Sequence, residues 1–344
     1  MVTHIEINDQ QVGPGYPCYI IAEAGVNHNG DISLAKELVC AAAEAGANAV
    51  KFQTFSPESL ATPYTPKALY QHRDGGSTES QRSMLQRLCL PLDAYESIIS
   101  ECTAKHIAFM SSPFGIEEAR FLGKLGMPAF KISSGEITNY PLLSYVAGTK
   151  KPVILSTGMS SLADVEQAIR VFDQACTRDR LVLLHCLSSY PAPVNEVNLR
   201  AMQTLLHSFQ LPVGYSDHTI GSSIAIGAVA LGACVIEKHL TLDVDMDGPD
   251  HKASMEPGDM ALMIKQIRDL ESAMGTGIKC PARSESDTLK VARRSLVAAV
   301  DLLKGTKLRE DMVLFKRPGT GLSPSRLPEL LGATLNQDVA ADTL

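Results

Sequence analysis

The sequence predicts an α/β fold in which a (β/α)8 TIM barrel is followed by a small β-rich module. Up to Gly275, short apolar runs typical of buried parallel strands alternate with helix-like segments. Eight such pairs within about 250 residues favour a closed barrel over an open doubly wound sheet. Beyond Gly275 the pattern changes to short alternating runs. A chain of 344 residues is long enough for both parts.

The predicted elements follow one another closely along the first part of the chain. Strands are predicted over residues 19–24, 49–52, 107–111, 129–132, 153–155, 181–186, 212–216 and 234–237. Helices are predicted over residues 31–45, 91–105, 116–125, 140–147, 162–175, 198–209, 220–231 and 258–273. Asp31 or Ser33 is a suitable cap for the first helix, and Gly46 is a suitable stop. Residues 56–90 form a long polar segment between two predicted elements. A loop of this length is usually functional, and we expect it to act as a substrate lid.

The domain boundaries follow from composition. The barrel is predicted over residues 1–275, and a linker rich in Gly, Ser and charge over residues 276–290. The β-rich module is predicted over residues 291–344, with strand-like runs at 295–299 and 312–315 and a helix around 325–331.

Overall composition narrows the class of protein. The formal net charge of −7 argues against a nucleic-acid or anionic-membrane binder, although a local pair of lysines can still bind an anionic small molecule. The eight cysteines show no CxxC spacing, so we expect buried, reduced thiols. The N-terminus lacks an apolar signal core, and no apolar run approaches the roughly 20 residues of a membrane span. These features predict a cytoplasmic enzyme with no membrane and no nucleic-acid partner.

One stretch, residues 212–255, places two histidines at equivalent positions. His218 and His239 each lie in the polar cluster that follows one of two predicted strands, 212–216 and 234–237, with one helix between them. A right-handed strand, helix and strand unit brings these two strand ends side by side. Together with the nearby carboxylates Asp217, Glu237, Asp247 and Asp250, the two imidazoles can hold a divalent metal. The alternative is that each histidine is an unrelated polar residue at a strand end.

Further polar residues leave the predicted strands at the edge that carries the active site in such barrels. They are Glu23, Lys51, Ser112, Lys131, Ser134, Glu136, Ser156, Tyr190, Ser216, His218, Glu237 and His239. Lys51 and Lys131 lie within apolar strands and are costly to bury without an anionic partner. That partner is either a substrate anion, cradled also by the neighbouring serines, or an interior glutamate that merely stabilises the barrel. Glu23 and Glu237 are the acid/base candidates.

The motifs around these residues resemble one enzyme family, in order and over essentially the whole chain. They are IIAEAGVNHNGD, AVKFQTF, SSPF, KISSGE, STGMS, LLHCLSSYP, GYSDHT, IEKH and GPDHKASM. Their sequence is similar to the N-acetylneuraminate (sialic acid) and legionaminic acid synthase family. The last part of the chain, with RRSLVAA, LLKGTKL and KRPGTG, resembles the antifreeze-like (SAF) module found at the C-terminus of such synthases.

The resemblance implies a C–C bond-forming transferase. It would condense phosphoenolpyruvate with the aldehyde of an N-acetylated hexose, release phosphate and form a nine-carbon 2-keto sugar acid. The positions that bind the family's divalent metal, Mn²⁺ or Mg²⁺, match His218 and His239. Positions that hold phosphoenolpyruvate match Lys51, Ser112, Lys131, Ser134 and Ser216. Positions around the sugar or the acid/base chemistry match Glu23, Tyr190, Glu237 and Asp250.

The remaining expected substrate-binding residues are Glu136, Ser156, Ser188 and Arg317. Ser188 stands where some family members carry Asn. Arg317, in KRPGTG, matches an arginine that reaches the sugar from the partner subunit of a domain-swapped homodimer.

The acceptor sugar stays open at this point. The GPDHKASM segment resembles the sialic and legionaminic acid branches more than the pseudaminic acid branch, which leaves N-acetylmannosamine and 2,4-diacetamido-2,4,6-trideoxymannose. One alternative function is a synthase of the 3-deoxy-octulosonate 8-phosphate type, which would lack the C-terminal module and need arginines for a phosphorylated pentose. The other is a non-catalytic carbohydrate-binding barrel, which would have lost a metal histidine or a strand-end lysine.

Overall fold

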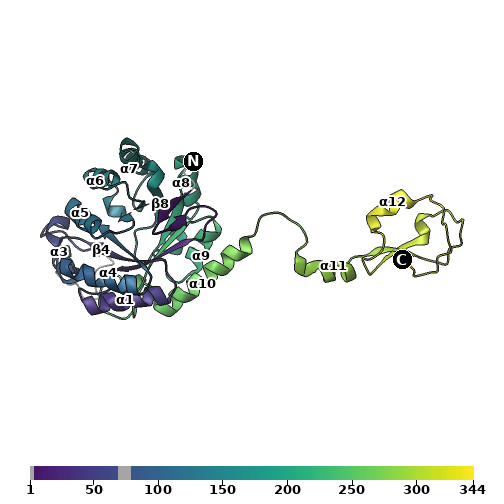
Figure 1. The fold of residues 1–344 in the computed structure, drawn as a ribbon, viewed down its shortest axis with the longest axis horizontal. Helices are drawn as coiled ribbons and strands as arrows, with labels where there is room; N and C mark the ends of the chain where they lie inside the picture. The colour runs from purple at the N-terminus through teal and green to yellow at the C-terminus, as the bar shows by residue number, and fades with distance from the viewer. Residues whose placement is uncertain (1–3, 69–78) are drawn as a thin grey trace. The chain divides into compact units, whose positions relative to one another are not determined.

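The first part of the chain is a barrel of parallel strands. A computed structural model describes residues 4–68 and 79–344, which divide into two compact units, Met1–Gly275 and Thr276–Leu344. The barrel strands are β3 (Tyr19–Gly25), β4 (Ala49–Thr54), β5 (Ala108–Pro113), β6 (Phe130–Ile132), β7 (Val153–Ser156), β8 (Leu181–Cys186), β9 (Val213–Asp217) and β10 (Val235–His239). They pair in the order β5-β4-β3-β10-β9-β8-β7-β6, and the two end strands, β5 and β6, lie against each other, so the barrel is nearly closed. Figure 1 shows this barrel with its helices. The predicted barrel is confirmed.

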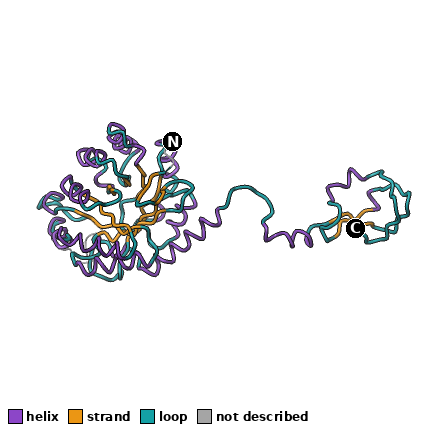
Figure 2. The backbone as a smooth tube through the Cα atoms, viewed as in Figure 1, coloured by secondary structure: helices purple, strands orange, loops and turns teal. Residues whose placement is uncertain are grey.

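Helices surround the strands (Figure 2). They are α1 (Ile32–Glu44), α4 (Tyr95–Ala104), α5 (Ile116–Lys124), α6 (Tyr140–Gly148), α7 (Leu162–Gln174), α8 (Ala201–Phe209), α9 (Ser223–Ala230) and α10 (Pro257–Met274). Asp31, not Ser33, caps α1, because its carboxylate accepts from the backbone N–H of Ser33 and Leu34. Among the described helices, none combines the length and the apolar character needed to cross a membrane.

The segment over residues 56–90 is less loop-like than we predicted. It contains the helices α2 (Pro57–Leu60) and α3 (Gln81–Leu88), while residues 69–78 lie outside the described part. Met84 and Leu88 of α3 are buried against Val26 and Phe55 of the barrel. The helix was not predicted because its few apolar residues stand in a segment of mostly polar composition. Whether the segment acts as a lid remains a prediction.

The inside of the barrel has an apolar floor below a polar layer. The floor consists of Ile5, Ile7, Val12, Tyr19, Ile21, Ala49, Ala108, Met110, Ala129, Ile154, Val182, Leu184, Cys234 and Val235. Its first three side chains come from an N-terminal hairpin of β1 (Ile5–Ile7) and β2 (Gln10–Val12). Because side chains alternate between the two faces of a strand, the next inward-facing residue of each strand lies one layer higher. In this way Glu23 follows Ile21, Lys51 follows Ala49 and Glu237 follows Val235.

The second unit is a small β-rich module, as predicted. Its strands β11 (Ser295–Ala298) and β12 (Val313–Lys316) pair antiparallel, and single bridges join Leu302 to Val339 and Lys307 to Thr334. Two short helices accompany them, α11 (Ser286–Ala292) and α12 (Leu327–Leu330). The helix α11 begins inside the segment that we expected to be a linker.

The cysteines are all free thiols. Cys18, Cys102, Cys186 and Cys234 are buried, in agreement with the expectation from composition. The expectation was wrong for two of the others, which are exposed: Cys176 in the turn after α7 and Cys280 in the segment before α11.

Truncating the hairpin side chain Ile7 should destabilise the barrel. Ile7 is fully buried in the apolar floor, so Ile7→Ala would leave a cavity and lower the free energy of unfolding by about 2–5 kcal/mol. Glu6→Ala, on the exposed face of the same strand, should change it by less than about 0.5 kcal/mol. Because the chain contains no Trp, urea unfolding is best followed by far-UV circular dichroism. Equal stability of the two variants would contradict the role of the hairpin.

Candidate active site

A pocket of about 470 Å³ opens at the carboxyl ends of the barrel strands. Every predicted site residue of the barrel lines it: Glu23, Lys51, Ser112, Lys131, Ser134, Glu136, Ser156, Ser188, Tyr190, Ser216, His218, Glu237, His239 and Asp250. Arg317 belongs to the second unit, where its Nε donates to the carbonyl of Ala292 over 2.9 Å. The rule that barrel chemistry gathers at strand exits therefore found residues from all eight strands.

Four charged side chains form a buried network at the bottom of this pocket, in the polar layer above the apolar floor. Lys51 Nζ lies 2.6 Å from Glu23 Oε2 and 3.6 Å from Glu237 Oε2, and Lys131 Nζ lies 3.2 Å from Glu237 Oε1. All four side chains are at most 5% exposed. Glu237 thus joins both lysines, and it also accepts a hydrogen bond from Ser216 Oγ over 2.9 Å. Without substrate, the lysines have the interior glutamate partners that we considered as an alternative.

The two glutamates differ in their affinity for a proton. Burial raises the pKa of Glu23, and the nearby charge of Glu237 adds to the effect against the opposing Lys51. Burial acts on Glu237 in the same sense, but Lys131 and Lys51 outweigh it and lower the pKa of that carboxyl. The network therefore holds Glu237 as an anion and makes Glu23 the carboxyl that accepts a proton more readily.

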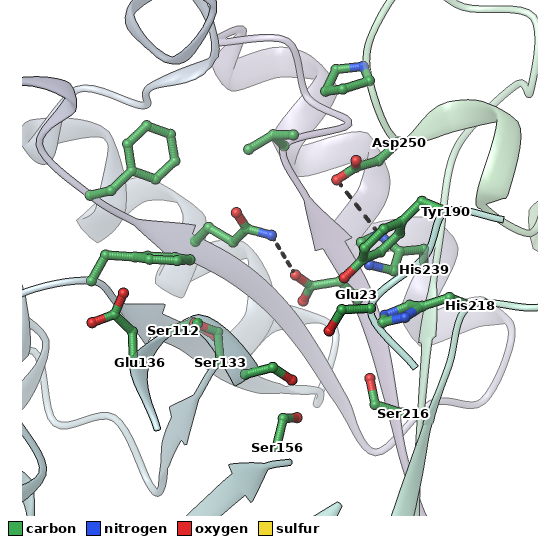
Figure 3. Close-up of a pocket in the computed structure, with 18 of the residues that line it drawn as sticks. Glu23, Ser112, Ser133, Glu136, Ser156, Tyr190, Ser216, His218, His239 and Asp250 are labelled. Atoms are coloured by element: carbon green, nitrogen blue, oxygen red, sulfur yellow. Dashed lines mark hydrogen bonds and ion pairs between the residues drawn. The ribbon is translucent and has the colours of Figure 1, made fainter. Parts of the chain in front are cut away.

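The two histidines converge on one side of the pocket (Figure 3), with their ring centroids 5.4 Å apart. His218 Nδ1 lies 2.7 Å from the carbonyl of Leu187. Since a carbonyl only accepts, Nδ1 carries the proton and the lone pair is on Nε2. His239 Nδ1 is buried, makes no hydrogen bond among the described residues, and lies 3.9 Å from Asp250 Oδ2. These two imidazoles fit a divalent metal, because each has a ring nitrogen available for it.

Three of the carboxylates that we expected near the histidines are placed differently. Asp217 faces away from the pocket, because strand alternation puts it on the side opposite Ser216. Asp247 is exposed in the loop after β10, and Glu237 is engaged by the lysines. Of these four carboxylates, Asp250 is the one that lies beside a site histidine without a lysine partner among the described residues, 3.9 Å from His239 Nδ1. Within residues 4–68 and 79–344, no three His, Cys, Asp or Glu side chains form a complete metal site, so two histidines would leave coordination positions open.

An aromatic ring covers the histidines. The ring of Tyr190, from the loop after β8, lies 4.1 Å from that of His218 and 5.7 Å from that of His239 between centroids. The same loop is held at its base, because the backbone N–H of Ala192 donates to the carbonyl of His218 over 2.9 Å. Tyr190 therefore forms a wall on the side of the pocket that carries Asp250 (Figure 3).

Hydroxyl groups occupy the other side of the pocket (Figure 3). Ser133 Oγ and Ser156 Oγ are buried and make no hydrogen bond among the described residues. Nearby, the backbone N–H of Gly158 donates to Ser134 Oγ over 3.0 Å. A Cβ at Gly158 would lie 2.7 Å from Ser134 Oγ and 2.3 Å from Ser188 Oγ, so any other residue would push these two hydroxyls aside. Unpaired hydroxyls around a backbone N–H are suited to an oxyanion.

The sequence analysis missed other residues that line the pocket. Gln53 donates to Glu23 Oε1 over 3.1 Å, and Cys186 lies 3.8 Å from His218 Nδ1. Strand alternation, counted on from Lys51 and from Leu184, was a signal for both. An apolar wall, for which the sequence offered no comparable signal, consists of Val26, Phe55, Leu60, Met84, Leu85, Leu88 and Phe114.

Comparison with known proteins agrees with this geometry. Residues 38–279 match the model of the NeuB family and residues 293–344 match that of the SAF domain. The chain is 48% identical to the N,N'-diacetyllegionaminic acid synthase of Campylobacter jejuni, over 94% of this chain and 98% of the relative. It is 46% identical to the Legionella pneumophila protein of the same name, over 96% and 94% of the two chains.

A solved structure shares the fold of the barrel and extends the comparison. The N-acetylneuraminic acid (sialic acid) synthetase of Leptospira borgpetersenii superposes with a TM-score of 0.74 at 33% identity, covering 83% of this chain and 95% of that chain. The alternatives of a pentose-phosphate synthase without a C-terminal module and of an inert barrel do not fit these matches, since the module, both histidines and both lysines are present. The chain belongs to the NeuB family of phosphoenolpyruvate-dependent sugar-acid synthases and carries a C-terminal SAF domain.

Proposed function

We propose that this pocket joins phosphoenolpyruvate to the open-chain aldehyde of 2,4-diacetamido-2,4,6-trideoxymannose, giving a nine-carbon 2-keto sugar acid of the legionaminic type and inorganic phosphate. One observation carries the assignment of the site. A cationic pair, Lys51 and Lys131, lies in the same pocket as two imidazoles that each have a free ring nitrogen. The lysines suit an anionic substrate such as phosphoenolpyruvate, and a metal on the imidazoles would polarise the carbonyl group of the sugar aldehyde, so the reaction needs both side by side.

Phosphoenolpyruvate binds over the lysines and the serines. Its phosphate and carboxylate take up the positive charge of Lys51 and Lys131, which are too deeply buried to be paired by solvent. Ser112, which already accepts from Lys51 Nζ over 3.2 Å, together with Ser134, Ser156 and Ser216 supplies donors to the oxygens. The support is the pair of unpartnered hydroxyls, Ser133 and Ser156, which a bound oxyanion would satisfy.

His218 and His239 would hold a divalent metal, Mn²⁺ or Mg²⁺. When bound, it supplies Lewis acidity toward an aldehyde oxygen. Leu187 keeps the lone pair of His218 on Nε2 through its carbonyl, and Asp250 lies 3.9 Å from the free nitrogen of His239. Tyr190 packs over both rings and keeps bulk water away from them.

The carbon–carbon bond forms between C3 of phosphoenolpyruvate and the aldehyde carbon of the sugar. The aldehyde oxygen takes up a proton and becomes the new hydroxyl group. Water then adds at C2 and loses a proton. As the resulting C2 hydroxyl gives up its own proton to form the keto group, the bond between C2 and the bridging oxygen breaks, and phosphate leaves with the bonding electrons. Glu23 accepts and donates protons during these steps, because it lies beside Lys51 and, of the two glutamates, is the one whose pKa is raised. Glu237 stays anionic and keeps Lys51 and Lys131 in place.

The choice of acceptor rests on the apolar wall defined above. The diacetamido sugar carries a methyl at C6 and an extra acetamido group, where N-acetylmannosamine has hydroxyls. The side chains of Phe55, Met84 and Phe114 can contact the C6 methyl and the methyl of the acetamido group, and they would leave hydroxyls without partners. The two relatives at 48% and 46% identity are both named N,N'-diacetyllegionaminic acid synthases.

The working enzyme is proposed to be a cytoplasmic, domain-swapped homodimer of two-domain chains. Residues 1–275 form the synthase barrel, residues 276–290 connect it and residues 291–344 form the SAF domain. In this assembly Arg317 reaches the acceptor sugar in the barrel of the partner subunit. The support is the resemblance of KRPGTG to the family motif and the exposed apolar side chains of the second unit, such as Leu303 and Phe315.

The acceptor is tested by phosphate release from phosphoenolpyruvate in the presence of Mn²⁺. We expect kcat/KM for 2,4-diacetamido-2,4,6-trideoxymannose to exceed that for N-acetylmannosamine by about tenfold or more, since a few misplaced hydroxyls cost that much in an apolar site. A preference for N-acetylmannosamine would make the product a sialic acid. Release with neither sugar in metal-loaded protein would overturn the proposed function.

Removing the charge of Glu237 should stop turnover without removing the metal. Glu237→Gln keeps the shape of the side chain but takes away the anion that holds Lys51 and Lys131 in place, so kcat should fall by about 100-fold or more. Binding of Mn²⁺ should stay within about twofold, because His218 and His239 are unchanged. Glu117→Gln, at a 76% exposed side chain, is the control. Full activity of Glu237→Gln would exclude its proposed role.

A methyl group at Gly158 should weaken the binding of phosphoenolpyruvate. Gly158→Ala forces Ser134 and Ser188 apart, so KM for phosphoenolpyruvate should rise by about tenfold while the fold is retained. Gly148→Ala in α6 is the matched control, because among the described residues a Cβ there meets no atom within 4 Å beyond its own helix. Steady-state kinetics with both variants test the serine cradle, and an unchanged KM in Gly158→Ala would argue against it.

A further inference from the structure

A buried ion pair lies directly behind the two histidines. Asp217 and Lys238 are register partners on β9 and β10, and His218 and His239 are the next residues along each chain segment. Ser216 and Glu237, which precede the pair, face the pocket. By strand alternation, the histidines face the pocket as well, and the ion pair faces the layer between strands and helices.

Both members of the pair have several hydrogen-bond partners and are closed off from water. Lys238 Nζ donates to Asp217 Oδ2 over 2.8 Å, and the two side chains are 1% and 0% exposed. Asp217 Oδ1 accepts from the backbone N–H of Thr219 over 2.9 Å and from its hydroxyl over 2.8 Å. Lys238 Nζ also donates to the Thr219 carbonyl. The residues on both sides of His218 are therefore held by one lysine on the neighbouring strand.

Stability by itself does not account for two charges at this place. Burying an ion pair costs desolvation free energy that an apolar pair of similar volume avoids. On the other side of Lys238 the register partner is Ala22 of β3, which is buried in the apolar layer between strands and helices. An apolar pair would make no directional hydrogen bonds. The hydrogen bonds of the carboxylate and the ammonium group fix both the register of β9 on β10 and the path of the backbone after His218.

We propose that Asp217, Lys238 and Thr219 are positioning residues that set the separation and direction of the two imidazoles for metal binding. The inference rests on the proposed function, in which His218 and His239 hold a divalent metal. Two ring nitrogens bind one ion only if their positions are kept within a few tenths of an ångström, and the support for that precision comes from the residues behind them. The carbonyl of Leu187 orients one ring, and the ion pair holds both backbones.

The test is Mn²⁺ binding to the full chain without substrates, measured as free Mn²⁺ by electron paramagnetic resonance. Lys238→Met leaves the length of the side chain but removes its bonds to Asp217 and Thr219, and the dissociation constant for Mn²⁺ should rise by about tenfold or more. Arg268→Met is the matched control. It removes a partly buried ion pair with Glu271 and a bond to the Cys18 carbonyl, at the amino end of β3. It should lower the melting temperature and leave Mn²⁺ affinity within about twofold.

A second variant covers the case in which Lys238→Met does not fold. Thr219→Val keeps the volume and removes one donor to Asp217, so the dissociation constant should rise several-fold with a small change in melting temperature. If the unchanged protein binds Mn²⁺ and every variant that folds, Thr219→Val alone included, binds it equally well, the positioning role is overturned and the pair is only structural. If the unchanged protein binds no Mn²⁺, the metal site of the proposed function fails, and this inference fails with it.

Discussion

The structure depends on four charges buried inside the barrel. Lys51, Lys131, Glu23 and Glu237 are stable there only because each one has a partner of opposite charge, and the partners come from β3, β4, β6 and β10. A register error in any of these strands would leave a charge unpaired in a medium of low polarity, which is among the most destabilising changes available to a fold. The same network makes the site reactive, because an anionic substrate can replace the glutamates as the partner of the lysines.

The apolar floor makes this arrangement possible. The N-terminal hairpin closes the end of the barrel below the site with Ile5, Ile7 and Val12, so the polar layer meets solvent on one side only. Exclusion of water strengthens every electrostatic interaction in the layer above. The site therefore combines a rigid apolar base, a charged layer at the strand ends, and loops that add Tyr190, Asp250 and the apolar wall.

Much of the fold and the site could be predicted because strands, helices and the residues at strand ends are recognised from neighbouring residues. The strand 181–186 was predicted with the boundaries that it has in the structure, and the site residues were found by the rule that strand exits meet at one edge. Three features could not be found in this way. The direction of Asp217 depended on which face of β9 is inside, the partners of the lysines came from distant strands, and α3 reached the pocket from a segment of polar composition.

By itself the sequence determined the order of the elements, the residues at the strand ends and the resemblance to a family, because periodicity, caps and motifs are written in neighbouring residues. The tertiary structure decided which of those residues act on one another. It paired Glu237 with two lysines, separated Asp217 from the pocket and placed it behind the histidines, and gave the pocket an apolar wall. The physical reason is that burial and charge pairing depend on distances between residues far apart along the chain, and only the closed barrel sets those distances.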